Sequence, residues 1–377
     1  MHVLYLNARY IPEGIGGPAH TARFLAEQMV REGHRATVFC RSSQPGIARE
    51  DMAGVRVIRA GLDVPMLQAA GLFLKTLDQD GPDVIHCLFP REFPLNVVAQ
   101  AARERELPIV QTLLSFNLMC HQSFVRDGRN CTEQCPECRK NTPVERDYCG
   151  QVAAAVGISR YMLDLHERAE LFSGTCQKRV IYDAYVPAAQ PAAADEAGKG
   201  EILRLGFLGR LDPLKGIERL LESLTGPELR DRRWRLKIAG SGAPAYEQSL
   251  KARFADARIE FLGFVDPGVL LSSVDVLVAP ALWEEPLGRI VLEAYAHGVP
   301  VVASARGGMA ETVEHGRTGY QFDPGEPHGL ARIIGQCLDA PGALREMKPR
   351  ALAKWRQEFT PQVIAAQYLD VYESVSR

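Results

Sequence analysis

The sequence lacks the long apolar run that a membrane-spanning helix requires. No stretch approaches about 18 uninterrupted apolar residues. The first residues, 2–7 (HVLYLN), also lack the basic start and apolar core of a secretory signal. We therefore expect a cytoplasmic protein that contacts a membrane at most peripherally, on its inner face.

An excess of one charge sign is absent as well. Lys and Arg number 44 and Asp and Glu 46, which gives a formal net charge of -2. Proteins whose main partner is a nucleic acid are usually strongly basic, so no nucleic-acid partner is expected. The hydrophobic content of 46% supplies enough apolar material for cores and argues against disorder. A chain of 377 residues suits about two domains.

Cysteine, in contrast, is plentiful. There are nine cysteines, and five crowd into one stretch: Cys120, Cys131, Cys135, Cys138 and Cys149. The spacing Cys-x3-Cys-x2-Cys is dense enough for a metal site, and it also occurs in iron–sulfur radical enzymes. We expect a structural zinc on the last four cysteines, with the first as a substitute ligand. Reduced thiols are the main alternative, and disulfides are disfavoured in the cytosol.

Short apolar runs alternate with amphipathic stretches along most of the chain, which predicts parallel sheets covered by helices on both faces. The predicted strands are residues 2–6, 36–40, 55–59, 83–88, 108–112, 151–158, 203–209, 236–240, 259–263, 276–280 and 299–304. The predicted helices are residues 19–32, 66–77, 95–106, a segment from Ser159, 217–224, 246–254, 287–297 and 327–338.

The alternation is interrupted once, by a Pro-, Ala- and Gly-rich stretch typical of a linker. The chain is thus predicted to form two doubly wound α/β domains, residues 1–185 and 201–358, joined by the linker 186–200. The first domain carries the cysteine-rich insertion at 120–149. In such sheets ligands bind beyond the carboxyl ends of the strands, and two facing domains form a cleft.

Residues 283–293 (WEEPLGRIVLE) follow a buried strand. Pro286 suits the first position of a helix, so Leu287, Gly288 and Arg289 are expected to present backbone N–H groups. Such a helix start binds phosphate, and the glycine allows the ligand to come close.

Two glutamates, Glu285 and Glu293, lie in this segment. Eight helical residues span about 12 Å, whereas the carboxylates of a retaining glycosidase lie only about 5 Å apart. The two glutamates are therefore interpreted as separate binding residues, each of which accepts hydrogen bonds from hydroxyl groups. The alternative is a helix cap and a solvated side chain.

Residues 206–216 (GFLGRLDPLKG) occupy another strand–helix turn. Arg210 and Lys215 suit a diphosphate, although the Gly-Lys-[Ser/Thr] order of a P-loop is absent. A surface turn with solvated charges is the alternative. A further glycine cluster, residues 14–18, matches the dinucleotide pattern only in part, because Ala19 stands at its last position.

These segments, together with residues 298–311 (GVPVVASARGGMAE) and 316–319 (GRTG), resemble glycosyltransferase family 4. The Gly-Gly loop near residue 16 and residues 83–86 (DVIH) are similar to that family too. The resemblance implies the GT-B fold, in which two Rossmann-like domains face each other across a cleft. It further implies retaining, metal-independent transfer from a UDP- or GDP-type nucleotide sugar. Residues 359–377 match the family's last helix, which crosses back to the N-terminal domain.

The resemblance also assigns roles to individual residues. Arg210 and Lys215 would bind the donor diphosphate and stabilise it as it departs. Glu285 would hold the donor sugar at the reacting centre, and Glu293 would bind the ribose hydroxyls. Backbone amides and short loops would supply the other donor contacts. These contacts are Gly16 and Gly17 at the phosphate, Gly240, Gly242, Phe264 and Val265 at the base, and Leu287, Gly288 and Arg289 at the sugar and phosphate.

One position departs from the family. Where its members have Thr-Leu-His-Asp, this chain has Leu114 and Ser115 in place of the last two residues. Leucine has no donor or acceptor for a sugar hydroxyl, which favours a deoxysugar or pentose donor. Alternatively Ser115 or Asn117 takes over the contact and an ordinary hexose is used.

The acceptor is not identified by the sequence: a saccharide, a lipid-linked glycan and a small natural product all remain open. A nucleotide-sugar epimerase of GT-B fold is an alternative from another enzyme class. A non-catalytic nucleotide-sugar-binding protein is the third. Acceptor-dependent release of free nucleotide distinguishes these three functions.

Overall fold

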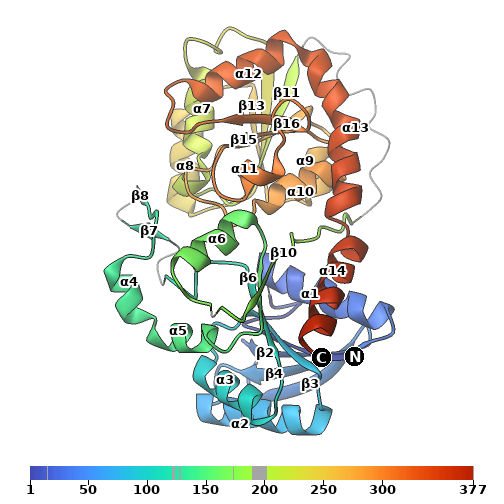
Figure 1. The fold of residues 1–377 in the computed structure, drawn as a ribbon. Coiled ribbons are helices and arrows are strands. Elements are labelled where there is room, and N and C mark those ends of the chain that lie inside the picture. Colours follow the sequence, from blue (N-terminus) through green and yellow to red (C-terminus); the bar gives the residue numbers. More distant parts are fainter. Residues whose placement is uncertain (15, 121–123, 127–128, 173, 189–201, 377) are drawn as a thin grey trace. The chain divides into compact units, whose positions relative to one another are not determined.

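The computed structural model describes the chain except for residues 15, 121–123, 127–128, 173, 189–201 and 377. It divides into two compact units (Figure 1). Unit 1 comprises Met1–Ala184 and Pro361–Arg377, and unit 2 comprises Tyr185–Thr360. Most of the predicted linker, 186–200, lies outside the described residues.

Unit 1 is built on an eight-stranded sheet in the order β10-β9-β6-β5-β1-β2-β4-β3, in which all neighbours are parallel except β3 and β4. Its strands are β1 (His2–Asn7), β2 (Arg35–Ser42), β3 (Ile47–Met52), β4 (Val55–Gly61), β5 (Val84–Phe89), β6 (Ile109–Leu113), β9 (Ala154–Gly157) and β10 (Gln177–Val180). A separate hairpin joins β7 (Val125–Arg126) and β8 (Arg129–Asn130). Its helices are α1 (Gly17–Arg31), α2 (Met66–Asp80), α3 (Leu95–Glu104), α4 (Pro136–Asn141), α5 (Pro143–Cys149), α6 (Arg160–Arg168) and α14 (Pro361–Val375).

Helix α14 completes the core of unit 1, although it comes last in the sequence. It packs beside α1 (Figure 1). The hydroxyl of Tyr372 lies 2.7 Å from Nδ1 of the buried His86, and the hydroxyl of Tyr368 lies 3.0 Å from Oγ1 of Thr112. Burial lowers the pKa of His86 to about 3, so its ring stays neutral within this aromatic cluster.

Unit 2 is built on a six-stranded parallel sheet in the order β13-β12-β11-β14-β15-β16. The strands are β11 (Leu203–Leu208), β12 (Trp234–Ala239), β13 (Ile259–Gly263), β14 (Val276–Ala279), β15 (Val301–Ser304) and β16 (Gly319–Phe322). The helices are the 3₁₀ turn η1 (Pro213–Lys215), α7 (Ile217–Thr225), α8 (Pro244–Arg253), α9 (Pro267–Leu271), α10 (Arg289–Ala296), α11 (Met309–Thr312), α12 (Gly329–Asp339) and α13 (Pro341–Glu358).

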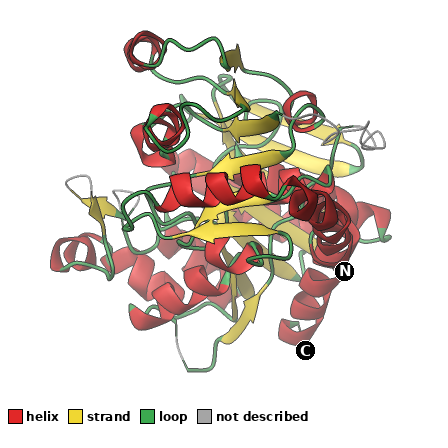
Figure 2. Cartoon of the chain, turned by 90° about the horizontal axis from the view of Figure 1, so that it is seen from above, coloured by secondary structure: helices red, strands yellow, loops and turns green. Residues whose placement is uncertain are grey.

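The predicted doubly wound α/β architecture is confirmed. Figure 2 shows helices packed against the strands, as expected for parallel strands that are apolar on both faces. All six residues of β1 and all four of β14 are buried, and they contribute to cores made largely of Val, Leu, Ile and aromatic residues.

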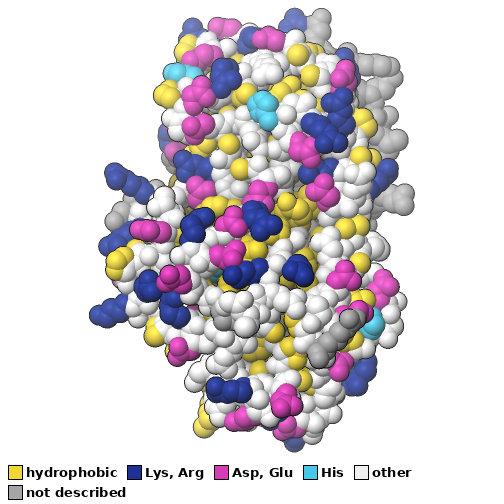
Figure 3. Space-filling model, in the orientation of Figure 1, with side chains coloured by type: hydrophobic (Ala, Val, Ile, Leu, Met, Phe, Trp, Pro, Cys, Tyr) yellow, Lys and Arg dark blue, Asp and Glu magenta, His cyan; other side chains and the backbone are white. Residues whose placement is uncertain are grey.

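The surface carries both charge signs, interspersed over the face that Figure 3 shows, as the near-zero net charge suggests. Among the residues that the structure describes, no helix is long and apolar enough to cross a membrane.

Candidate donor site of unit 2

The predicted donor-site loops of unit 2 meet at one edge of its sheet. They follow β11, β12, β13 and β14, whose carboxyl ends share that edge because the strands are parallel. The backbone N–H of Leu211 donates to the carbonyl of Ser241 at 2.9 Å, and that of Gly240 donates to the carbonyl of Gly263 at 2.7 Å. The first three loops are thus hydrogen-bonded to one another.

Glycines allow these loops to pack so closely. A Cβ atom on Gly240 would lie 1.8 Å from the carbonyl oxygen of Gly209, and one on Gly242 would lie 2.1 Å from that of Leu211. Gly240 also has a φ of 132°, a conformation that favours glycine. The loop 240–242, predicted to hold the base, therefore needs its glycines for loop-to-loop contact.

The basic turn 206–216 is fixed against the loop that follows β14. Gly216 has a φ of 73°, and a Cβ atom there would lie 1.9 Å from the carbonyl oxygen of Pro280. The backbone N–H of Leu282 donates to the carbonyl of Leu214 at 2.8 Å. This contact brings Lys215 next to the segment that contains both predicted glutamates.

Lys215 and Glu285 form an ion pair in which the Nζ atom hydrogen-bonds to the carboxylate. The Nζ atom also lies 5.2 Å from the centroid of the Trp283 ring, within reach of a cation–π interaction. Both charged side chains are partly buried, with exposed fractions of 27% and 13%, so solvent screens the pair less than it would on the open surface.

Two arginines of these segments also pair with nearby acids: Arg210, predicted to bind the diphosphate, and Arg289, predicted to contribute only its backbone amide. Arg210 lies 3.5 Å from Asp212, and its side chain is 70% exposed. Arg289 lies 4.0 Å from Glu293, four residues further along the chain. The positive charges are therefore compensated when no ligand is bound, and a diphosphate would compete with the carboxylates for them.

Helix α10 begins two residues after the start of the predicted helix 287–297, and three residues after Pro286. It starts at Arg289, and Gly288 precedes it in the left-handed conformation with a φ of 78°. Pro286 is thus not the first helical residue: it stands in the approach to the helix, because the left-handed Gly288 interrupts any helix that began there. No side chain of the described residues caps α10, which leaves its start available to an anion.

The loop around Glu285 is supported by residues to which the sequence analysis gives no role. The carboxylate of Glu284 accepts a hydrogen bond from the backbone N–H of Gly307 at 2.7 Å. The backbone N–H of Gly308 donates to the carbonyl of Glu285 at 2.8 Å. A Cβ atom on Gly307 would lie 2.2 Å from that carbonyl oxygen. Only the Gly-Gly pair of the 298–311 motif signals this contact in advance.

Tyr185 is another residue that sequence reasoning missed. Burial raises the pKa of its hydroxyl well above the usual value, and the neighbouring carboxylates of Glu293 and Asp266 raise it further. The tyrosine thus lies close to Glu293, which is predicted to bind the ribose. The centroid of its ring lies 6.2 Å from that of the His297 ring. It stands just before the linker, where no motif identifies it.

Phe264 and Val265 follow β13 in the loop predicted to hold the base. Phe264 is 86% exposed, and Val265 is half-buried. An exposed aromatic ring beside the other loops offers an apolar surface that a planar base could cover.

The remaining predicted residues lie in unit 1. Gly16 precedes α1 with a φ of 112°, and Gly17 is the first residue of that helix, at the carboxyl end of β1. Leu114 packs partly against the core of unit 1. The Ser115 hydroxyl donates to the Asn117 side-chain oxygen at 2.6 Å, so these two alternative sugar contacts already bond to each other.

The predicted zinc ligands are only partly gathered. Across the described residues, no three His, Cys, Asp or Glu side chains form a group that could hold a metal ion. Cys138 and Cys120 lie 3.5 Å apart, between sulfur atoms. Burial, and after it the neighbouring Cys176, raises the pKa of Cys149.

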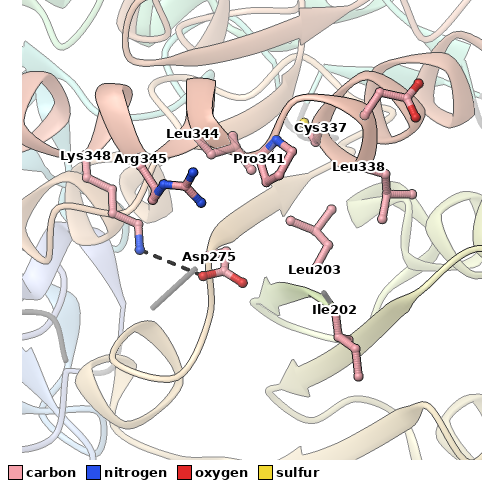
Figure 4. A pocket seen from close by; sticks show the side chains of 10 residues that line it. Ile202, Leu203, Asp275, Cys337, Leu338, Pro341, Leu344, Arg345 and Lys348 are labelled. Carbon is pink, nitrogen blue, oxygen red and sulfur yellow. Dashed lines mark ion pairs between the residues drawn. The ribbon is translucent and has the colours of Figure 1, made fainter. Parts of the chain in front are cut away.

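A cavity of about 350 Å³ in unit 2 lies at a different place (Figure 4). Its lining includes Leu203 at the start of β11 and Asp275 just before β14, so it opens at the amino ends of the strands. Arg204 holds Asp275 with contacts of 2.8 and 3.1 Å, and Lys348 lies 3.8 Å from it. These paired charges fix the strand starts, and the cavity shares no residue with the predicted donor site.

Two family models match the chain. Residues 16–173 match the family described as "Glycosyl transferase 4-like domain", and residues 203–340 match "Glycosyl transferases group 1". Among the curated relatives, the glycogen synthase of Mycobacterium tuberculosis is 29% identical, over 100% of this chain and 95% of that protein. The phosphatidyl-myo-inositol mannosyltransferase of Mycobacterium leprae is 32% identical, over 52% of each chain.

Solved structures show the same fold. HepE of Anabaena, crystallised with UDP and glucose, matches with a TM-score of 0.75 at 22% identity, over 99% of this chain and 100% of that one. The sucrose-phosphate synthase of Thermosynechococcus elongatus matches with a TM-score of 0.75 at 20% identity, over 99% and 98% of the two chains.

The fold and the two domain matches define a class of protein: a glycosyltransferase of the GT-B fold, with two Rossmann-like domains. Within that class, the chain combines a glycosyl transferase 4-like domain in unit 1 with a glycosyl transferases group 1 domain in unit 2.

Proposed function

We propose that the protein is a retaining, metal-independent glycosyltransferase that uses a nucleotide-diphosphate sugar of the UDP or GDP type. The arrangement of Arg210, Lys215 and Glu285 beside the uncapped start of α10 carries this proposal. It offers two cations and a helix start to a diphosphate, and a carboxylate to a sugar, within one unit.

In this proposal the cations do the work that a metal ion does in other transferases. As the bond between sugar and diphosphate breaks, negative charge grows on the departing phosphate, and Arg210 and Lys215 stabilise it. Lys215 can turn from Glu285 to the phosphate, which frees the carboxylate to accept hydrogen bonds from sugar hydroxyls. Backbone amides at Leu287, Gly288 and Arg289 add further donors.

The rest of the donor occupies the neighbouring loops. Glu293 binds the ribose hydroxyls, and the loops with Gly240, Gly242, Phe264 and Val265 hold the base. The family resemblance gives Gly16 and Gly17 of unit 1 to the phosphate of the donor. UDP-glucose is the first donor to test, since HepE of Anabaena was crystallised with UDP and glucose. The acceptor class is a saccharide, a lipid-linked glycan or a small natural product.

The test has two stages. A thermal-shift screen of UDP, GDP, ADP and their sugars identifies the nucleotide, because a ligand at 100 times its Kd stabilises the folded state by about 2.7 kcal/mol. Release of free nucleotide is then measured with and without candidate acceptors. We expect release that depends on the acceptor and a product with the donor's anomeric configuration.

Lys215→Ala is the informative variant, and Glu346→Ala is its control. Loss of the lysine should lower kcat/KM by about 100-fold or more. Glu346 is exposed in α13 and pairs only loosely with Arg350 at 3.8 Å, so its loss should leave the rate unchanged. Epimerised donor without acceptor, or binding without turnover for every acceptor, would reject the transferase in favour of its two alternatives.

A further inference from the structure

The cysteine-rich segment of unit 1 brings four thiols into one neighbourhood from three separate local structures. Cys120 ends a turn after β6, in which its N–H donates to the carbonyl of Phe116 at 2.7 Å. Cys131 follows the β7–β8 hairpin. Cys135 precedes α4, and Cys138 lies in the first turn of that helix. Figure 1 shows this hairpin and α4 close together at one side of unit 1.

The spacing of the central pair is that of two ligands of one metal ion. The sulfur atoms of Cys120 and Cys138 lie 3.5 Å apart. A disulfide needs about 2.05 Å, whereas sulfurs bound at about 2.3 Å around a tetrahedral zinc stand about 3.8 Å apart. The two thiols therefore form no disulfide, and their sulfur atoms lie at nearly the separation of adjacent zinc ligands.

The other two thiols are held beside this pair. Cys135 caps α4, because the backbone N–H of Cys138 donates to its sulfur at 3.5 Å. The side chain of Gln134 donates to the carbonyl of Met119 at 2.9 Å, which ties the start of α4 to the residue before Cys120. The backbone N–H of Phe124 donates to the Cys120 sulfur at 3.3 Å, and that of Cys131 donates to the carbonyl of Phe124 at 3.0 Å, so one residue links the backbone of Cys131 to the Cys120 thiol.

Cys149 has different surroundings. Cys149 is the last residue of α5 and is fully buried. The cysteine near it is Cys176, not one of the other four. Cys131 and Cys135, in contrast, are only half-buried. Their side chains can turn toward the Cys120–Cys138 pair without repacking a core.

We propose that Cys120, Cys131, Cys135 and Cys138 bind one zinc ion as a four-cysteine structural site, and that Cys149 is not a ligand. Binding replaces four S–H bonds by four Zn–S bonds and releases four protons to solvent. Four thiolates around one Zn²⁺ leave the site with a net charge of about -2.

A metal explains how this segment holds its shape. The β7–β8 hairpin has only two residues in each strand, and a hairpin of that size is not stable alone. Helix α4 has six residues, far fewer than an isolated helix needs. A zinc ion bound by all four cysteines would link the β7–β8 hairpin, the turn that ends at Cys120, and α4. Metal ions stabilise other small domains in the same way.

The experiment compares two single variants of the full chain, purified without affinity metals. Zinc is measured by elemental analysis and by native mass spectrometry. We expect about one zinc per wild-type chain, near-wild-type zinc in Cys149→Ser, and loss of most of the zinc in Cys120→Ser. Cobalt substitution should give the absorption of a tetrahedral thiolate site in the wild type and in Cys149→Ser.

Folding is checked independently by circular dichroism, and Cys149→Ser is the stricter folding control because that thiol is the more deeply buried. The proposal is overturned if the wild type holds no zinc after equilibration with zinc chloride. It is also overturned if Cys149→Ser loses the metal while Cys120→Ser keeps it. Mapping a Cys120–Cys138 disulfide in the native protein would overturn it too.

Discussion

At the scale of single residues, the two glutamates of unit 2 have different surroundings. Glu285 is paired with Lys215, and Glu293 lies beside Arg289 and Tyr185. In the proposed site Glu285 binds the donor sugar, which takes part in the reaction. Glu293 binds the ribose, which does not. Their removal should therefore affect different steps.

Glu293→Ala should weaken the binding of free nucleotide about ten- to hundredfold, since hydrogen bonds to a charged group contribute about 1.5–3 kcal/mol. Glu285→Ala should leave nucleotide binding nearly unchanged and lower kcat. Calorimetry with UDP or GDP and steady-state kinetics separate the two effects. Wild-type nucleotide affinity in Glu293→Ala would remove its ribose role.

Leu114 leads to a second residue-scale prediction, about the donor. A sugar hydroxyl buried against leucine would lose its partner at a cost of about 1–3 kcal/mol. We therefore expect a deoxyhexose or pentose donor to have the higher kcat/KM when donors on the same nucleotide are compared. The Ser115–Asn117 hydrogen bond supports this expectation, because both side chains already have a partner. A preference of about tenfold or more for the ordinary hexose would reject it.

The residues proposed to bind the donor have a pattern in the sequence, whereas the residues that position them do not. Arg210, Lys215 and Glu285 stand in strand–helix turns with charge, and that pattern is visible in the sequence. Tyr185 and Glu284 act through neighbours that are distant in the chain, and such contacts exist only after the sheet has formed. No local pattern marks them.

At the scale of elements, the glycine turns of unit 2 are points of close backbone approach. Gly216→Ala should destabilise the protein by more than about 1 kcal/mol, because its φ is 73° and its Cβ would meet the carbonyl of Pro280. Gly335 is a matched control in α12. A Cβ there would have 4.0 Å to its nearest neighbour, and alanine should stabilise the helix by about 0.5–1 kcal/mol. Urea unfolding measures both, and equal effects would contradict this account.

Most predicted strands and helices are present within one to three residues of their expected bounds, because buried parallel strands and amphipathic helices have clear periodicities. The failures have physical reasons. Strand β3 is an exposed antiparallel edge strand, so it has no apolar pattern. Helix α13 contains Pro349, which the sequence-based rules treat as a helix breaker. The predicted start of α10 was wrong. Pro286 favours a helix start at that position, but the left-handed conformation of Gly288 prevents the helix from beginning before Arg289.

At the scale of the whole molecule, the proposed chemistry needs no catalytic metal. Turnover should therefore persist in EDTA without added divalent cations, measured as acceptor-dependent nucleotide release. The protein's zinc content is determined in the same samples, so that loss of the proposed structural zinc is not mistaken for loss of a catalytic one. Abolished turnover in protein that keeps its fold and its zinc would show that a metal takes part.

Acid should weaken the fold through two buried histidines of unit 1. Burial lowers the pKa of His86 to about 3 and that of His166 to about 4, below the unfolded value near 6.5. The unfolded chain then binds more protons than the folded one, so stability is lost as pH falls below about 6.5. The slope approaches about 1.4 kcal/mol per pH unit for each histidine. Urea unfolding between pH 7 and 5, where most carboxylates stay ionised, measures it, and a flat profile would contradict it.

The return of α14 to unit 1 has a consequence for the order of folding during synthesis. Ile364, Tyr368 and Tyr372 belong to the core of unit 1, and the ribosome makes them after all of unit 2. Unit 2 is complete in the nascent chain after Thr360. It is therefore able to fold while the core of unit 1 still lacks α14. Unit 1, which begins first, is thus completed after unit 2. A stop codon before residue 361 would leave the core of unit 1 incomplete and exposed, while the whole of unit 2 would still be made.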